Sequence, residues 1–446
     1  METKKIMLTK ELAKQCGWKE NGRYDVVVIG AGPAGIGAAI SAARKGMRVA
    51  LIESCGFAGG VATKSCVPLY YGFGVDGKQS TAGLSEEFIR RMDEVGAASF
   101  IVARDCAFPE FRPIAGRPLT AKIQLHPETM KLMYRRMLDE AKVDCIFYAQ
   151  MVDAVTEGDR ITALLVNFLE GPGLVYADYF IDCTGDALMF RQAGVPVNKY
   201  AEEDGMHKSM FFFVGGVTPF DHDYNCKLYQ EARAAGRLPE KVWGHFGYSL
   251  SLNPGVVNVA VCFNEGDALD SRDMSRMDGE LRETVFAIVD FLRKEMPGFA
   301  GCYLLETASH VGVRVGQGIV GMDSVTEGLI ASGMATDTPV ALINRSYGAH
   351  ANKRKTFMAT WSVHSGGFSA VPMGALVSPS LANALAAGRC ISADPHTVGT
   401  FRMMNTCMTL GEAAGLMASL GGDMRALEYA RLRPELDKAG FILEEK

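Results

Sequence analysis

The sequence predicts an α/β fold, and three observations support this prediction. An apolar run at 23–29, a small-residue stretch with helical character at 34–45 and a second apolar run at 47–52 form a β-α-β pattern. A glycine-rich turn joins the first strand to the helix. The chain has 446 residues, 48% hydrophobic and 22% charged, which is ordinary globular usage and enough for two or three domains.

The middle and end of the chain add further elements. Apolar residues at helical spacing predict a helix at 127–141, and three extended runs separated by glycine-containing breaks predict a small antiparallel meander. The meander strands are expected at 151–155, 161–168 and 174–177, followed by a strand at 179–182. Strands are also expected at 256–263 and 384–391, and helices at 276–294 and 404–420.

These elements predict a discontinuous domain arrangement. We expect an N-terminal extension at 1–22, the first part of a nucleotide-binding domain at 23–200, an α+β substrate domain at 201–365 and a return to the first domain at 366–446. The return is expected because the last strand and the last small-residue helix suit packing against the first β-α-β unit.

Composition argues against several classes of partner. The formal net charge is -5 and no run of Lys or Arg occurs, so we expect no nucleic-acid or membrane surface. No signal-peptide pattern opens the chain and no stretch of about 18 apolar residues occurs, which favours a cytoplasmic protein. The 11 cysteines form no C-x-x-C pair, so we expect neither an iron-sulfur cluster nor another metal site.

The glycine turn carries the clearest chemical signal. Its residues Gly30, Gly32, Pro33, Ala34 and Gly35 follow a strand and open a helix, where backbone N–H groups and the helix dipole favour a pyrophosphate. Glu53, followed by Ser54, ends the next strand, where an acid can accept a hydrogen bond from a ribose hydroxyl. This pattern predicts a Rossmann-like dinucleotide site, with a plain glycine turn as the alternative.

The same glycine spacing occurs twice more and is weaker there. At Gly72, Gly74 and Gly77 a turn follows in place of a helix, and after the residues 316–321 no strand ends in an acid at the right distance. We therefore expect no second nucleotide domain for NAD(P)H.

Six further segments give the sequence a family resemblance. They read GFAGGVAT at 56–63, TAGLSEEF at 81–88, HPE at 126–128, FIDCTGDA at 180–187, AGRCIS at 387–392 and RMMNTCM at 402–408. Together they resemble the FAD-dependent oxidoreductase family related to the fumarate reductase and succinate dehydrogenase flavoproteins. The resemblance implies an FAD cofactor and two-electron transfer to or from a small organic substrate.

The resemblance also implies which residues surround the cofactor. Gly59, Gly60 and Ala62 would lie along the flavin, Thr184 and Gly185 near the nucleotide half, and Arg389 with the start of the last helix near the ribityl chain and isoalloxazine ring. The remaining residues of this predicted set are Val61, Val152, Gly388, Thr406, Cys407 and Met408. Noncovalent binding is the default, with Cys66 and His126 as candidate covalent anchors.

Three residues are the catalytic candidates. The resemblance places a histidine at His364 and arginines at Arg314 and Arg402, so His364 would be an acid/base or orienting group and the arginines would bind anionic or carbonyl oxygens. Each has a purely structural alternative. The sequence departs from the relatives at 394–398 and 314–318, which points to an unusual substrate.

Two other functions stay open. The chain could be an electron-transfer subunit that serves a partner protein, as some relatives do beside iron-sulfur proteins. A nucleic-acid-modifying flavoprotein is disfavoured by the acidic charge balance.

Overall fold

The largest sheet of the structure contains the predicted β-α-β unit and confirms the α/β fold. A computed structural model of the chain describes residues 8–75, 77–101, 111–120, 122–200, 206–333, 336–344 and 367–444. The seven-stranded sheet has the order β10-β11-β12-β1-β2-β9, and β23 pairs with β12 outside that path. Its strands are β1 (Lys19–Ile29), β2 (Val49–Ile52), β9 (Asp144–Ile146), β10 (Gln150–Glu157), β11 (Arg160–Phe168), β12 (Gly171–Asp182) and β23 (Ala384–Ala386).

This sheet combines a parallel part with an antiparallel part. Strands β23, β12, β1, β2 and β9 pair in parallel, whereas β10, β11 and β12 form the antiparallel meander. The two strands predicted at 174–177 and 179–182 are one continuous strand, β12, because no glycine or proline interrupts the chain between them. β1 pairs with β12 from Gly173 to Asp182, whereas on the other edge the segment 171–176 pairs with β11 and 180–182 pairs with β23.

Other predicted elements differ at their ends. β1 begins at Lys19 rather than at residue 23. The run at 256–263 divides into β17 (Val257–Val259) and β18 (Phe263–Asn264). The run at 384–391 is a strand only as far as Ala386, since Gly388 has φ +84° and starts the 3-10 turn η4 (Gly388–Cys390).

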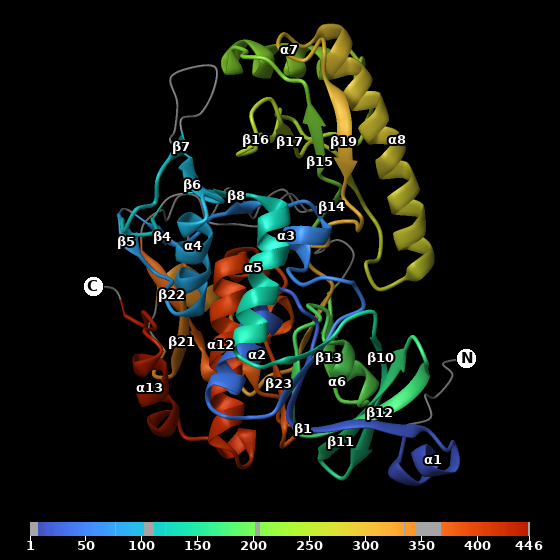
Figure 1. The fold of residues 1–446 in the computed structure, drawn as a ribbon, viewed down its shortest axis with the longest axis vertical. Coiled ribbons are helices and arrows are strands. Elements are labelled where there is room, and N and C mark those ends of the chain that lie inside the picture. Colours follow the sequence, from blue (N-terminus) through green and yellow to red (C-terminus); the bar gives the residue numbers. More distant parts are fainter. Residues whose placement is uncertain are drawn as a thin grey trace.

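The predicted helices are present as α2 (Pro33–Arg44), α5 (Pro127–Glu140), α8 (Ser271–Glu295) and α12 (Met404–Leu420). Residues of β1 alternate between two cores: Val26 and Val28 join the core beneath α2, α5 and α12, and Val27 and Ile29 join the core shared with the meander. Figure 1 shows α2, α5 and α12 next to one another in front of the sheet. The parallel strands are therefore buried on both faces.

A second four-stranded sheet has its own core. It is antiparallel throughout, in the order β16-β17-β15-β19. Helices α7 (His222–Ala234) and α8 surround it at the end of the molecule away from the large sheet (Figure 1). Its other strands are β15 (Phe212–Gly215), β16 (Tyr248–Leu250) and β19 (Tyr303–Thr307). Its core includes Phe212, Val257, Leu281 and Phe299, all fully buried.

The remaining described elements are short. A third sheet has the order β3-β8-β6-β7, with strands β3 (Leu69–Tyr70), β6 (Ala98–Ile101), β7 (Phe111–Arg112) and β8 (Ile123–Leu125). The two-stranded pairs are β4 (Gly74–Val75) with β5 (Lys78–Gln79), β13 (Val197–Lys199) with β20 (Gln317–Ile319), β14 (Lys208–Ser209) with β18, and β21 (Pro339–Asn344) with β22 (Phe368–Pro372). The other helices are α1 (Lys10–Gln15), α3 (Val61–Lys64), α4 (Leu84–Glu94), α6 (Leu188–Gln192), α9 (Glu327–Ser332), α11 (Val398–Phe401), α13 (Tyr429–Lys438), η3 (Met373–Leu376) and η5 (Met424–Ala426). Among these described helices none has the length and apolar character needed to cross a membrane.

The two weaker glycine patterns lie in other structures. Gly74 and Gly77 belong to the β4-β5 hairpin, and Gly318 belongs to β20, which pairs antiparallel with β13. Neither pattern lies in a strand-to-helix turn like that at Gly30.

Helices α2 and α12 pack with their backbones in contact. A methyl group at Gly411 would lie 1.8 Å from the carbonyl oxygen of Ala34, and one at Gly415 would lie 2.3 Å from that of Ala38. Higher residue numbers on α2 thus meet higher numbers on α12, so the two helices run in the same general direction. The contact joins the C-terminal part of the chain to the first β-α-β unit.

We expect Gly411→Ala to lower the free energy of unfolding by about 1–3 kcal/mol, because the added methyl group would clash with the backbone of α2 and force the two helices apart. Gly279→Ala is the matched control, since Gly279 lies inside α8 with open space around it, and it should stabilise by about 1 kcal/mol. Chemical denaturation of both variants measures the difference. Equal effects of the two substitutions would contradict this account of the helix contact.

Glu412, on the same helix, is a buried acid that caps α4. Its carboxylate accepts a hydrogen bond from the backbone N–H of Leu84 at 2.9 Å, at a helix start whose N-cap, Gly83, offers no side chain. Burial raises the pKa of Glu412 to about 8, although the N–H of Leu84 and the charge of Arg44 oppose the rise. The folded protein therefore keeps this side chain mostly protonated at neutral pH.

This burial predicts a pH dependence of stability. An unfolded glutamate ionises at a lower pH than folded Glu412, so between these two pKa values the folded state holds an extra proton and the free energy of unfolding falls as pH rises. Glu412→Gln keeps the acceptor oxygen and cannot ionise. We expect the melting temperature of Glu412→Gln minus that of the parent to increase from about pH 5 to about pH 9. A difference that stays constant over this range would show that Glu412 does not titrate in this way.

Candidate functional site

The first of two adjoining cavities lies at the carboxyl ends of β1, β2 and β12. It has a volume of about 370 Å³, and Ile29, Ile52 and Cys183 mark the strand ends in its wall. In parallel α/β sheets ligands bind at this edge. Its other walls come from the start of α2, α3, the loop at 149–151, the turn at 184–186, the loop at 310–313 and the segment from 387 to 407.

The turn before α2 brings free N–H groups to this cavity. Gly30 has φ +92°, and a methyl group there would lie 2.7 Å from the carbonyl oxygen of Cys183. A methyl group at Gly35 would lie 1.8 Å from the oxygen of Gly30, so the helix must start directly on the strand. The N-cap, Gly32, provides no side-chain hydrogen bond. The first turn of α2 therefore keeps its N–H groups and positive dipole end for a ligand.

Glu53 is the buried acid at the end of β2. Its carboxylate accepts hydrogen bonds from the N–H of Ala31 at 2.8 Å, the N–H of Cys55 at 2.9 Å and the hydroxyl of Ser54 at 3.1 Å. Burial alone would raise the pKa of Glu53, but the charge of Lys64 and these three donors lower it overall. The side chain is thus an anionic acceptor in the cavity wall.

A second glycine pair closes against the first turn. Gly60 has φ +54°, and a methyl group there would lie 2.9 Å from the Cα of Gly32. The N–H of Gly59 donates to the carbonyl oxygen of Ala31 at 2.7 Å. The hydroxyl of Thr63 holds the same loop through the carbonyl oxygen of Ala58 at 3.0 Å. The two backbones are therefore fixed side by side along one wall.

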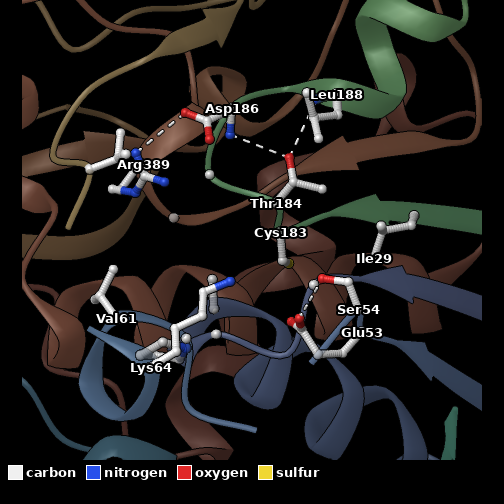
Figure 2. Close-up of a pocket in the computed structure, with 18 of the residues that line it drawn as sticks. Ile29, Glu53, Ser54, Val61, Lys64, Cys183, Thr184, Asp186, Leu188 and Arg389 are labelled. Atoms are coloured by element: carbon white, nitrogen blue, oxygen red, sulfur yellow. Dashed lines mark hydrogen bonds and ion pairs between the residues drawn. The ribbon is translucent and has the colours of Figure 1, made fainter. Parts of the chain in front are cut away.

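The opposite wall is the turn after β12. Asp182 is fully buried and accepts hydrogen bonds from the N–H and hydroxyl of Thr184 at 2.9 and 2.7 Å and from the N–H of Met189 at 2.8 Å. Burial raises the pKa of Asp182 although these bonds oppose the rise. Arg389 reaches this turn through an ion pair with Asp186 at 3.4 Å, and Figure 2 shows both beside Thr184.

Lys64 extends into the cavity between these walls. Figure 2 shows its side chain directed toward the space bounded by Glu53 and Ser54 on one side and the Arg389 turn on the other. No described residue forms a hydrogen bond or an ion pair with the ammonium group of Lys64, unlike the groups of Glu53 and Arg389 in the same site. His310, also in the wall, has its pKa lowered by partial burial and by the charge of Lys64. A cation is thus available where an anionic group could lie.

The second cavity, of about 230 Å³, adjoins the first. Both cavities are lined by Val61, Ser65, Val313, Arg389, Arg402 and Met404. The second one then continues toward the second sheet, where its wall includes Tyr71, Ser209, Phe211, His245, Tyr248, Asn258 and Arg314. A molecule in the second cavity would therefore meet a molecule in the first at the shared wall.

Most of the predicted cofactor residues lie together in the first cavity. Those that line it are Gly30, Gly32, Pro33, Ala34, Glu53, Ser54, Gly60, Val61, Thr184, Gly185, Gly388, Arg389 and Cys407. Those that do not are Gly35, Gly59, Ala62, Val152, Thr406 and Met408. Gly35 and Gly59 instead form the backbone contacts described above.

The others point elsewhere for reasons of secondary structure. Val152 is 44% exposed on β10, and its neighbour Met151 lines the cavity in its place. Thr406 and Met408 are buried in α12, whose helical turn presents Met404 and Cys407 to the cavity.

The candidate covalent anchors, Cys66 and His126, line neither cavity. His126 caps α5 by accepting a hydrogen bond from the N–H of Thr129 at 3.3 Å.

The catalytic candidates have different outcomes. Arg402 lines both cavities and Arg314 lines the second, so the structure brings these two arginines together. His364 lies outside the described residues. The sequence analysis did not select Lys64, Ser65, His310 or Tyr71. Lys64 and Ser65 directly follow the segment GFAGGVAT at 56–63, so their place next to that segment could have marked them as site residues. No local pattern marks His310.

A family model described as FAD dependent oxidoreductase matches residues 25–436. The chain belongs to this family. Its cofactor is FAD, and the protein is an FAD-dependent oxidoreductase.

Other comparisons are more distant or much shorter. A soluble pyridine nucleotide transhydrogenase of Hahella chejuensis is 66% identical over 41 residues, which is 9% of each chain, so the match spans only a small part of that relative. A geranylgeranyl bacteriochlorophyll reductase-like protein of Thermoplasma acidophilum aligns with a TM-score of 0.49 and 14% identity over 94% of this chain and 83% of its own. A flavin-dependent brominase aligns with a TM-score of 0.48 and 15% identity over 94% and 84% of the two chains.

The residues present fit FAD. The glycines let the backbone of the first turn lie at the cavity without side chains, the start of α2 offers N–H groups to phosphates, and Glu53 offers an acceptor for a ribose hydroxyl. The apolar side chains of Val61, Val313 and Met404 suit the flat faces of a ring at the shared wall.

We expect Lys64→Met to weaken FAD binding by about tenfold or more, because a charge-assisted contact to a phosphate is worth about 1.5–3 kcal/mol. Lys64→Arg should retain most of the affinity, and Lys227→Met, on the exposed α7, is the control for loss of one charge. Fluorescence titration of the apoprotein with FAD measures each dissociation constant. An unchanged constant for Lys64→Met would exclude this role.

Proposed function

We propose that this flavoenzyme transfers two electrons, as a hydride, between FAD in the first cavity and a small organic substrate in the second. The observation that carries the proposal is the wall shared by the two cavities, which would bring a cofactor ring and a substrate carbon into contact. When bound, FAD supplies the redox chemistry, and the protein supplies position and charge. A closer relationship to the fumarate reductase and succinate dehydrogenase flavoproteins is part of this proposal and rests on the segments quoted above.

The chain's own residues have separate tasks in this proposal. The turn before α2, Lys64 and Glu53 hold the nucleotide half, and Arg389, fixed by Asp186, reaches toward the flavin half. Arg314 and Arg402 hold the substrate by its oxygen atoms, because a guanidinium presents a planar pair of donors. His364 stays a prediction as the acid/base group.

Apolar walls complete the substrate site. Val67, Leu69 and Phe211 line the second cavity and limit the access of water. Exclusion of water strengthens the electrostatic contacts to the arginines and protects the reacting carbon from competing hydrolysis.

A cavity-filling variant tests this function. Ala260 lines the second cavity and not the first, so Ala260→Phe should leave FAD content unchanged and slow substrate-driven bleaching of the flavin by about tenfold or more. Ala234→Phe, on the exposed side of α7, adds the same ring away from both cavities. The measurement is an anaerobic screen of small organic compounds on the yellow holoenzyme, followed by rapid mixing with each active compound.

The outcomes separate the alternatives. Release of FMN, or of no flavin, on denaturation would contradict the cofactor assignment. Bleaching at the parent rate in Ala260→Phe would exclude the second cavity as the substrate site. Reduction only by a partner protein would favour the electron-transfer subunit.

A further inference from the structure

The second cavity contains two positive charges that no described carboxylate balances. Arg314, Arg389 and Arg402 all line it, and Arg389 pairs with Asp186 outside the cavity. Arg314 and Arg402 form no ion pair with an acid of the described residues, and no aspartate or glutamate is found among the described residues that line this cavity. The positive charge without a described counter-charge is therefore that of Arg314 and Arg402.

Their environment makes the imbalance costly. Burial, together with the charge of Arg402, lowers the pKa of Arg314 to about 9. Burial also lowers the pKa of Arg402, although the nearby Tyr71 phenol opposes this effect. In addition, Nε and Nη2 of Arg402 are shielded from solvent and have no hydrogen-bond partner among the residues that the structure describes. Buried charges of this kind are stabilised when an anion joins them.

Hydrogen bonds to the rest of the fold hold the side chain of Arg314 and the backbone of Arg402. Nη1 of Arg314 donates to the carbonyl oxygen of His207 at 2.6 Å. Arg402 lies between α11 and α12, and its backbone N–H donates to the carbonyl oxygen of Val398 at 3.0 Å. The guanidiniums thus come from two distant parts of the sequence, line the same cavity, and lie near enough for the charge of Arg402 to lower the pKa of Arg314.

The rest of the cavity has a different character. Val67, Leu69, Phe211 and Met403 form an apolar part of its wall, beside polar side chains such as Ser209, His245 and Asn258, and its volume of about 230 Å³ is small for a ligand site. A ligand that fits would carry its charge at the arginines and an apolar body against the apolar part of the wall.

We propose that the second cavity binds an organic monoanion, a carboxylate on an apolar body of about one ring, with the carboxylate at Arg314 and Arg402. This inference rests on the proposed function, because it names the class of substrate for the same site.

Calorimetric titration of the holoenzyme with benzoate tests the inference. Benzoate has the required charge and ring, benzamide keeps the shape without the charge, and succinate has two charges without the ring. We expect benzoate to bind, and benzamide and succinate each to bind about tenfold or more weakly, because charge-assisted hydrogen bonds or apolar contacts are lost. Benzamide as tight as benzoate, or succinate tighter than benzoate, would overturn the inference.

Variants locate the anion. Arg402→Gln and Arg314→Gln should each weaken benzoate binding about tenfold or more and leave benzamide binding nearly unchanged. Arg272→Gln removes the same charge from an exposed position at the start of α8 that lines neither cavity, and it should leave both affinities unchanged. FAD content and melting temperature are measured for each variant, and Arg402→Lys and Arg314→Lys replace any glutamine variant that does not fold.

The results distinguish this inference from the proposed function. A protein that holds FAD but gives no charge-dependent binding of benzoate contradicts the monoanion inference alone. A protein purified without FAD contradicts the proposed function. Loss of benzamide binding together with benzoate binding in the arginine variants would show that these residues support the cavity and do not recognise the charge.

Discussion

The close packing of α2 against α12 is the constraint on which the rest of the structure depends. Because Gly411 and Gly415 leave no side chain between the backbones, α12 lies directly on α2 and runs in the same general direction. Both helices therefore begin at the first cavity, which Ala34 lines from α2 and Met404 from α12. A single contact thus brings two positive helix ends, from opposite ends of the sequence, to one ligand site. The position of Arg402, just before α12, follows from the same contact.

Local patterns were sufficient to predict most of the large sheet and its helices. The β-α-β unit was visible because β1 and β2 are buried on both faces and read as continuous apolar runs, while α2 and α12 read as small-residue helices. Errors arose where a local pattern did not mark the end of an element. Strand β12 continues through 177–179 because it stays paired with β1 there, while its partner on the other edge changes from β11 to β23 without a turn. Such pairings depend on tertiary contacts that a single sequence does not display.

The site was predictable where a glycine turn marks it or where a segment of the family resemblance covers it. Gly30 and Gly60 were identifiable because their conformations and close contacts require glycine. Side chains that enter a cavity from segments without such a signal were not predictable, since their direction depends on packing. Tyr71 and His310 come from segments with no distinguishing pattern, and Val152 lies one residue from Met151, which has the cavity-facing position on β10. In a strand, an error of one residue exchanges the two faces.

The distribution of charge explains why two adjoining cavities can hold different ligands. In the first, the positive end of α2 and Lys64 lie near the anionic Glu53, so cationic and anionic groups share one space that suits a ligand with both phosphates and hydroxyls. In the second, cations occur without a described acid, so the local field has a single sign. Arg389 lines both cavities and forms an ion pair with Asp186. The negative charge of Asp186 keeps the positive charge of Arg389 from adding fully to that of Arg314 and Arg402. An arginine that only supported the fold could have been paired with a carboxylate in the same way. No acid of the described residues pairs with the other two, which is better explained by a ligand that brings its own negative charge.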